Sequence, residues 1–225
     1  MIRMPLHEDR TRRGARSNRE DYLQPMSERW PGGDLRSLVD WLQVESSLRW
    51  QPRKRADGKI ATYCDHYAAD LIEQACGQQL ISAWIWWADD AIRRLRAGEI
   101  VPVVYGQTVV EHGALGLYRW MQLWGDQFGW KRAGDDSSLR TEVSSRYTIG
   151  LILTPSHVSV VVPDSLEVSP GTLTPTSPPS PPLQSQAGSR NVRLWRQSDW
   201  YKTRTGVVRV WLDPSKLVNV TRPEK

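Results

Sequence analysis

The chain has 225 residues, of which 39% are hydrophobic, and its 30 Lys and Arg against 25 Asp and Glu give a net charge of +5. This length and composition predict one domain with its own core, and the lack of any apolar run of roughly 20 residues excludes a membrane span. Two cysteines cannot build a disulfide framework and no Cys/His cluster has zinc spacing, so no metal or other cofactor is expected.

Residues 1–32 are rich in charged side chains and close at Pro31-Gly32-Gly33. They predict a flexible charged N-terminal arm, followed by a single domain over residues 33–225. The arm has no apolar segment behind its basic residues, so we do not expect a secretory signal. Asp34 then suits the N-cap of a helix with apolar residues at helical spacing.

The clearest helix is predicted over residues 62–77. Its apolar residues fall on one face. Thr62 and Asp65 fit a capping box, and Gly77 fits a C-cap. Cys64 therefore lies in the first turn of this helix.

Other elements follow from local patterns. A polar loop with a turn at Asp57-Gly58 precedes the Cys64 helix. Three more helices are expected after it, at residues 83–99 (ending at Gly98), 112–127 (stopping at Gly129) and 137–145.

The later part of the chain predicts a small antiparallel sheet. Residues 147–155 and 157–163 are β-branched, apolar runs separated by a Thr-Pro-Ser turn, which is typical of a hairpin. A Pro/Ser/Thr-rich segment at residues 165–183 predicts an extended loop, and shorter strands are expected at residues 191–197 and 206–214. Helices followed by such a sheet indicate an α+β fold, with the helices packed on the sheet.

Cys64 and His157 are the candidates for chemistry. The free amides and positive dipole end of a helix N-terminus favour a thiolate, and His157 opens a strand that could pack against that helix. A cysteine nucleophile with a histidine base is one interpretation. The other is that Cys64 is a buried structural thiol and that His157 is an ordinary core residue.

Three blocks of sequence carry a family resemblance. They are RWQPRKRADGKIATYCDHYAADLIEQACG (residues 49–77), WMQLWGDQFGWKRAG (residues 120–134), and HVSVVVPDS (residues 157–165) followed by QSQAGSRN (residues 184–191). In this order they resemble the papain-like peptidoglycan amidases and peptidases of the NlpC-like and CHAP type.

The resemblance implies a papain-like fold and a set of site residues. Cys64 would be the nucleophile and His157 the base. Asn191 or Gln186 would be the third residue, which holds the imidazole. Asp65 stands where the family usually has Asn, and a carboxylate beside the thiol opposes its ionisation.

The resemblance also implies a function: a cell-wall lytic enzyme, either an antibacterial secreted effector or a phage lysin, that hydrolyses an amide of peptidoglycan stem peptides. The alternative is a catalytically inactive papain-like module that binds wall polymer or a partner protein. Expected partners are peptidoglycan and an immunity protein or secretion machinery. Nucleic acid is not expected, because no recognition motif accompanies the basic charge. We expect synthesis in the cytoplasm without a signal peptide, followed by action in the periplasm or on the cell wall after export or lysis. This route would fit a secreted effector as well as a phage lysin.

Overall fold

The computed structural model describes residues 32–76, 85–102, 104, 106–143, 148–163, 181–196, 200–202 and 204–213. The predicted N-terminal arm, apart from Gly32, lies outside these ranges. So do the expected C-cap Gly77 and most of the loop predicted at residues 165–183.

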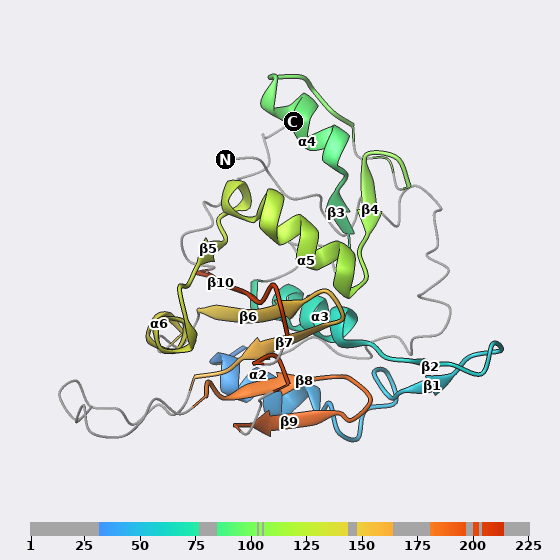
Figure 1. Cartoon of the computed structure of the whole chain (residues 1–225), viewed down its shortest axis with the longest axis vertical. Coiled ribbons are helices and arrows are strands. Elements are labelled where there is room, and N and C mark those ends of the chain that lie inside the picture. The colour runs from blue at the N-terminus through green and yellow to red at the C-terminus, as the bar shows by residue number, and fades with distance from the viewer. Residues whose placement is uncertain are drawn as a thin grey trace.

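Helices and short strands are interleaved in the first part of the chain, and the strands of the central sheet follow after α6 (Figure 1). The helices are α2 (Leu35–Leu42), α3 (Cys64–Cys76), α4 (Asp89–Arg96), α5 (Ala114–Leu123), the 3-10 helix η2 (Gly125–Phe128) and α6 (Asp136–Glu142). The strands are β1 (Arg53–Lys54), β2 (Ile60–Ala61), β3 (Ile85–Trp87), β4 (Val109–Glu111), β5 (Lys131–Arg132), β6 (Ile149–Thr154), β7 (His157–Val161), β8 (Gln184–Gln186), β9 (Val192–Trp195) and β10 (Val208–Leu212).

The central sheet has six strands in the order β5-β10-β6-β7-β8-β9, and every neighbouring pair is antiparallel. The predicted hairpin is confirmed as β6 and β7, with Thr154 opposite His157 across the turn. Two smaller sheets, β1–β2 and β3–β4, stand apart from the central one. The α+β class with an antiparallel sheet is therefore confirmed.

The two faces of the central sheet bury different side chains, as the alternation of a strand requires. Leu151 and Leu153 of β6 face the main core, whereas Ile152 packs in a second cluster with Leu139 of α6. A Cβ at Gly150 would lie 2.6 Å from Cγ2 of Val143, the C-cap of α6. Only glycine at position 150 therefore lets the end of α6 approach β6 so closely.

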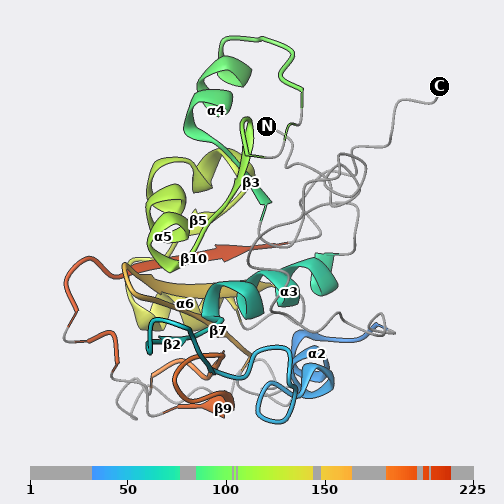
Figure 2. The same cartoon turned by 90° about the vertical axis from the view of Figure 1, so that its right-hand side faces the viewer.

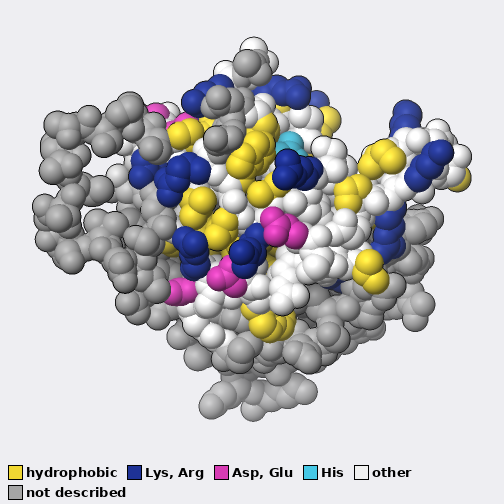
Figure 3. Space-filling model, turned by 90° about the horizontal axis from the view of Figure 1, so that it is seen from below, with side chains coloured by type: hydrophobic (Ala, Val, Ile, Leu, Met, Phe, Trp, Pro, Cys, Tyr) yellow, Lys and Arg dark blue, Asp and Glu magenta, His cyan; other side chains and the backbone are white. Residues whose placement is uncertain are grey.

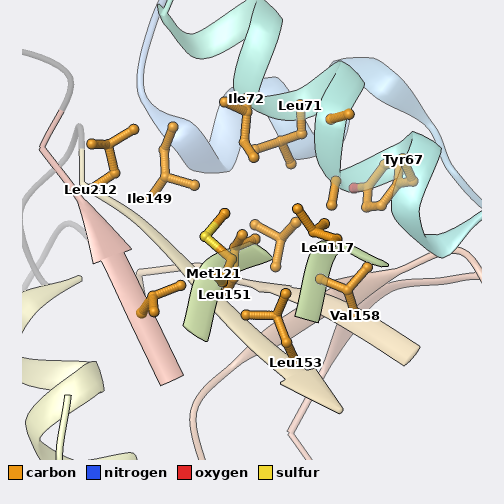
Figure 4. Packing of buried hydrophobic residues seen from close by; sticks show 14 of the residues in the cluster. Tyr67, Leu71, Ile72, Leu117, Met121, Ile149, Leu151, Leu153, Val158 and Leu212 are labelled. Atoms are coloured by element: carbon orange, nitrogen blue, oxygen red, sulfur yellow. The ribbon is translucent and has the colours of Figure 1, made fainter. Parts of the chain in front are cut away.

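Helices α3 and α5 cover the main-core face (Figure 2). Figure 4 shows Leu71 and Ile72 of α3 meeting Leu117 and Met121 of α5 above Leu151. Burying such side chains contributes about 1.5–3 kcal/mol each, so this interface fixes α3, and with it Cys64, on the sheet.

A buried ion pair anchors the segment before β1 to the same helix. Arg49 donates through Nε to Asp70 Oδ2 at 2.7 Å and through Nη2 to Asp70 Oδ1 at 3.0 Å. Trp50 Nε1 donates to Asp70 Oδ2 at 2.8 Å. Since Asp70 lies on α3, these three bonds fix where the β1–β2 hairpin leaves the body of the protein.

Several local predictions are confirmed. Asp34 caps α2, and its carboxylate accepts from the Ser37 N–H at 2.8 Å. The chain turns after η2 at Gly129, whose φ of 92° is the left-handed region that favours glycine. The turn at Gly58 is also present, although the short strands β1 and β2 on either side of it were not predicted.

Two helix predictions are wrong in part. The helix expected at residues 83–99 is a strand, β3, followed by the shorter α4, because the chain at Trp86 and Trp87 pairs with β4. The capping box of Thr62 and Asp65 is out of register, because α3 begins at Cys64 and Tyr63 directly precedes it. Within the described ranges, no helix has both the length and the apolar character needed to cross a bilayer.

Candidate active site

Cys64 is the first residue of α3, as predicted. The Tyr67 N–H donates to the Tyr63 carbonyl at 2.9 Å and so closes the first turn. The Cys64 side chain is 3% exposed and belongs to the main core. The backbone amide of Val158, the second residue of β7, acts on the thiol, which places the sulfur beside the start of that strand.

Burial, and after it the Asp65 carboxylate, raise the pKa of Cys64 to about 12. The amides of Val158, Asp65 and Cys64 itself lower the pKa but do not compensate. The helix amides act in the predicted direction, but removing the sulfur from water has the larger effect.

His157 begins β7, and Gln186 of β8 holds its ring. The distance from His157 Nε2 to Gln186 Oε1 is 2.8 Å. A carbonyl oxygen can only accept, so Nε2 carries the proton and Nδ1 has a free lone pair. Burial lowers the pKa of His157, while the bond to Gln186 and the Asp65 carboxylate act in the opposite direction. The ring is therefore an uncharged base near neutral pH.

An aromatic edge and a glycine enclose the imidazole. The Trp200 ring lies 4.7 Å from it, centroid to centroid, in a T-shaped arrangement. Trp200 Nε1 donates to Gln184 Oε1 at 3.1 Å, and Ser159 Oγ donates to the same oxygen at 2.6 Å. On another side, a Cβ at Gly188 would lie 3.2 Å from His157 Cε1. These contacts leave the ring little freedom to turn.

The thiol and the imidazole both lie at the start of β7, since the Val158 amide acts on the thiol and the carboxylate of Asp65, the neighbour of Cys64, acts on the imidazole. His157 and Ser159 alternate with Val158 along the strand, and the side chain of Val158 lies in the main core with Cys64. Across β8, Ser185 points to α3, where its hydroxyl meets Tyr67 Oη at 2.6 Å, whereas Gln186 points to His157. Among the described residues, no hydrogen bond joins the Cys64 sulfur directly to the His157 ring.

Asn191 has a different role from Gln186. Its Nδ2 donates to the carbonyls of Val44 at 3.0 Å and Trp50 at 3.1 Å, and its Oδ1 accepts from the Gly188 N–H at 3.0 Å. The side chain thus ties the turn between β8 and β9 to the segment before β1. Of the two amides proposed from the sequence, the structure gives Gln186 the contact with the imidazole.

Sequence reasoning missed Gln184 and Trp200. Gln184 could have been found, because two glutamines two residues apart on a strand share a face, and Gln186 was already a candidate. Trp200 follows β9 in a short irregular segment, where no periodicity indicates what its ring contacts. Only the folded chain brings it to His157.

The described residues contain no group of three His, Cys, Asp or Glu side chains that could hold a metal ion. The groups that the described residues bring together at the start of β7 are a thiol, an imidazole and an amide. No family model, curated protein or solved structure matches the chain, so the resemblance stays a prediction that rests on the motifs in the sequence.

Proposed function

We propose that this protein is a cysteine peptidase or amidase of papain-like fold that hydrolyses an amide bond of peptidoglycan stem peptides. One observation carries the proposal. Gln186 holds the His157 ring at the start of β7, and that strand packs against the helix whose first residue is Cys64. A thiol, a base with a fixed tautomer and an orienting amide are the parts that acyl transfer to sulfur requires.

The pKa shifts favour a neutral resting pair. The raised pKa of Cys64 and the lowered pKa of His157 both disfavour a preformed thiolate–imidazolium ion pair. His157 Nδ1 would take the thiol proton while the sulfur attacks the scissile carbonyl, and the imidazolium would then give this proton to the leaving amine. Water, deprotonated by His157, would hydrolyse the thioester and free Cys64.

The backbone at the start of α3 would stabilise the charge that develops on the carbonyl oxygen. The free N–H groups of a helix first turn bind an oxyanion, and the amides of Asp65 and Cys64 both act on the sulfur. No hydrogen bond joins the thiol and the ring among the described residues, and such catalytic bonds are often long in the absence of substrate. We expect substrate binding to bring the two groups within hydrogen-bond reach.

Two biological settings suit this activity. A phage lysin and an antibacterial effector both act on the wall of a bacterium, and an effector would also have an immunity protein as partner. The lysin setting and the effector setting are both proposals, and both depend on the proposed stem-peptide substrate.

Digestion of purified peptidoglycan tests the proposal. The intact chain should release fragments whose masses show one hydrolysed amide, with a new amine and a new carboxylate. Cys64→Ala should release none, while its circular dichroism spectrum stays that of the parent. Equal release by the two proteins would remove Cys64 from the mechanism and overturn the proposal.

A second candidate function is a non-catalytic module that binds wall polymer or a partner protein. It is favoured by the 3% exposure of Cys64 and by the pKa of about 12, since an inert core cysteine has both properties. In that case the chain would sediment with peptidoglycan, release no fragments, and bind equally well as Cys64→Ala.

A further inference from the structure

The β1–β2 hairpin is a basic projection just before the candidate nucleophile. Residues 51–61 contain four cations, Arg53, Lys54, Arg55 and Lys59, and one acid, Asp57. The hairpin extends away from the central sheet at the right of Figure 1. Seen from below in Figure 3, the projection at the right carries dark blue Lys and Arg side chains beside yellow hydrophobic ones.

The pairing of the hairpin separates an inner from an outer face. Arg53 lies opposite Ala61, and its guanidinium turns back to the body, where Nη2 donates to the Leu48 carbonyl at 3.1 Å and the group lies 6.0 Å from the Tyr63 ring centroid. Lys54 lies opposite Ile60, so the two share the other face. Both side chains are exposed, and the isoleucine is 57% exposed.

The charged side chains beyond Arg53 are exposed and available to a ligand. Asp57 lies 3.4 Å from Arg55, and both side chains are largely in solvent. Lys54 and Lys59 have no acidic partner among the described residues. A cation beside an exposed aliphatic side chain suits a ligand that presents a carboxylate next to a small apolar group.

The hairpin is also close to Cys64. Cys64 is the third residue after Ala61, which is at most about 11 Å of extended chain, and Arg53 contacts the ring of Tyr63, the neighbour of Cys64. The base of the hairpin is fixed on α3 by the bonds of Arg49 and Trp50 to Asp70. A chain lying along the hairpin would therefore be guided to the start of α3.

We infer that the exposed side chains of the β1–β2 hairpin bind the free carboxylates and alanine methyl groups of uncrosslinked stem peptides, with Lys54 and Lys59 on the carboxylates and Ile60 on the methyl groups. The inference rests on the proposed function and adds a substrate preference to it. Acidic stem peptides bind more tightly than stem peptides whose carboxylates are amidated.

Binding to the full-length Cys64→Ala chain tests this inference without turnover. The probes are soluble stem-peptide fragments prepared from purified peptidoglycan and the same fragments after carbodiimide amidation. Lys54→Gln/Lys59→Gln should weaken binding of the acidic fragments about threefold to tenfold, the range expected for two exposed ion pairs, and should reduce the salt dependence of binding. The amidated fragments should bind both proteins equally.

Arg93→Gln/Arg96→Gln is the matched control, because it removes two cations from α4, away from the hairpin. It should bind like the parent. The inference is overturned if the two variants bind alike, or if amidation has no effect. It is also overturned if the hairpin variant loses binding to anionic phosphatidylglycerol vesicles but not to the peptides, which would indicate a membrane surface as partner.

Fragment release by the chain with its native Cys64 separates this inference from the proposed function. If acidic fragments bind through Lys54 and Lys59 but no amide is hydrolysed, the proposed hydrolysis fails and the binding site stands. If amides are hydrolysed equally by the parent and by Lys54→Gln/Lys59→Gln, and both proteins bind the fragments equally, the hydrolysis stands and the hairpin site fails.

Discussion

Replacing Asp65 with asparagine should make the Cys64 thiol more reactive. Asp65 is 5% exposed and is the second cause, after burial, of the raised Cys64 pKa. The amide has the shape of the carboxylate without its charge, so the pKa of Cys64 should fall. A nearby charge typically shifts a pKa by about one unit or more, and one unit corresponds to 1.36 kcal/mol.

The expected size of the effect follows from the pKa of about 12. At about pH 8, roughly one Cys64 in ten thousand is ionised, and a fall of about one unit raises this fraction about tenfold. A less basic thiolate is also a weaker nucleophile, which offsets about half of the gain on a logarithmic scale. The alkylation rate at Cys64 should therefore rise about threefold to fourfold.

The assay is the rate of iodoacetamide labelling at Cys64, followed by mass spectrometry in a Cys76→Ala background. Asp90→Asn is the control, since Asp90 is an exposed acid on α4, and its rate should equal that of the parent. Thermal unfolding must be unchanged in both variants, so that different opening of the core does not explain the rates. A rate that stays constant or falls in Asp65→Asn would refute the reasoning, and so would a parent thiol that titrates near pH 8.5.

Three further predictions use other contacts. Gln186→Leu should lower the rate of amide hydrolysis by about tenfold to a thousandfold, as expected when the base loses its orienting partner. Asn191→Ala should instead lower mainly the unfolding free energy, by about 1–3 kcal/mol, as measured by urea titration. The unfolding free energy should fall as the pH is lowered from about 7 to about 5, because the lowered pKa values of His157 and His112 mean that the unfolded chain binds more protons than the folded chain in this range. The double variant with glutamine at both positions should show a shallower pH dependence, by at most about 1.4 kcal/mol per pH unit for each histidine. An equal slope in the parent and the variant would contradict the pKa shifts of the two histidines. Asp70→Asn should destabilise the fold by about 3–5 kcal/mol, the range for a broken buried ion pair, and a melting temperature close to that of the parent would show that Arg49 does not depend on this carboxylate.

The sequence predicted best the elements that local chemistry specifies. The β-branched composition of the runs on either side of the Thr-Pro-Ser turn favours strands, and they form β6 and β7. Asp34 caps α2 because its carboxylate reaches the N–H group three residues on. The segment around Trp86 and Trp87 was misjudged, because a short apolar run suits a helix and a strand equally and its partner β4 is more than twenty residues away.

The candidate site shows a similar limit. The place of Cys64 at the start of a helix and of His157 at the start of a strand could be read from the sequence. The ionisation of the thiol could not, because it depends on how deeply α3 packs on the sheet. The choice between Gln186 and Asn191 also depends on geometry, since only the first lies on the face of β8 that the imidazole shares.

The bonds of Asn191 have a consequence for how this protein can vary. One amide nitrogen has two hydrogens, and it gives one to the Val44 carbonyl and the other to the Trp50 carbonyl. These acceptors are six residues apart, so the length of the connection between them is set by a side chain almost 150 residues further along the chain. Related sequences that keep this asparagine should therefore lack insertions and deletions between positions 44 and 50, while the composition of that connection remains free to change.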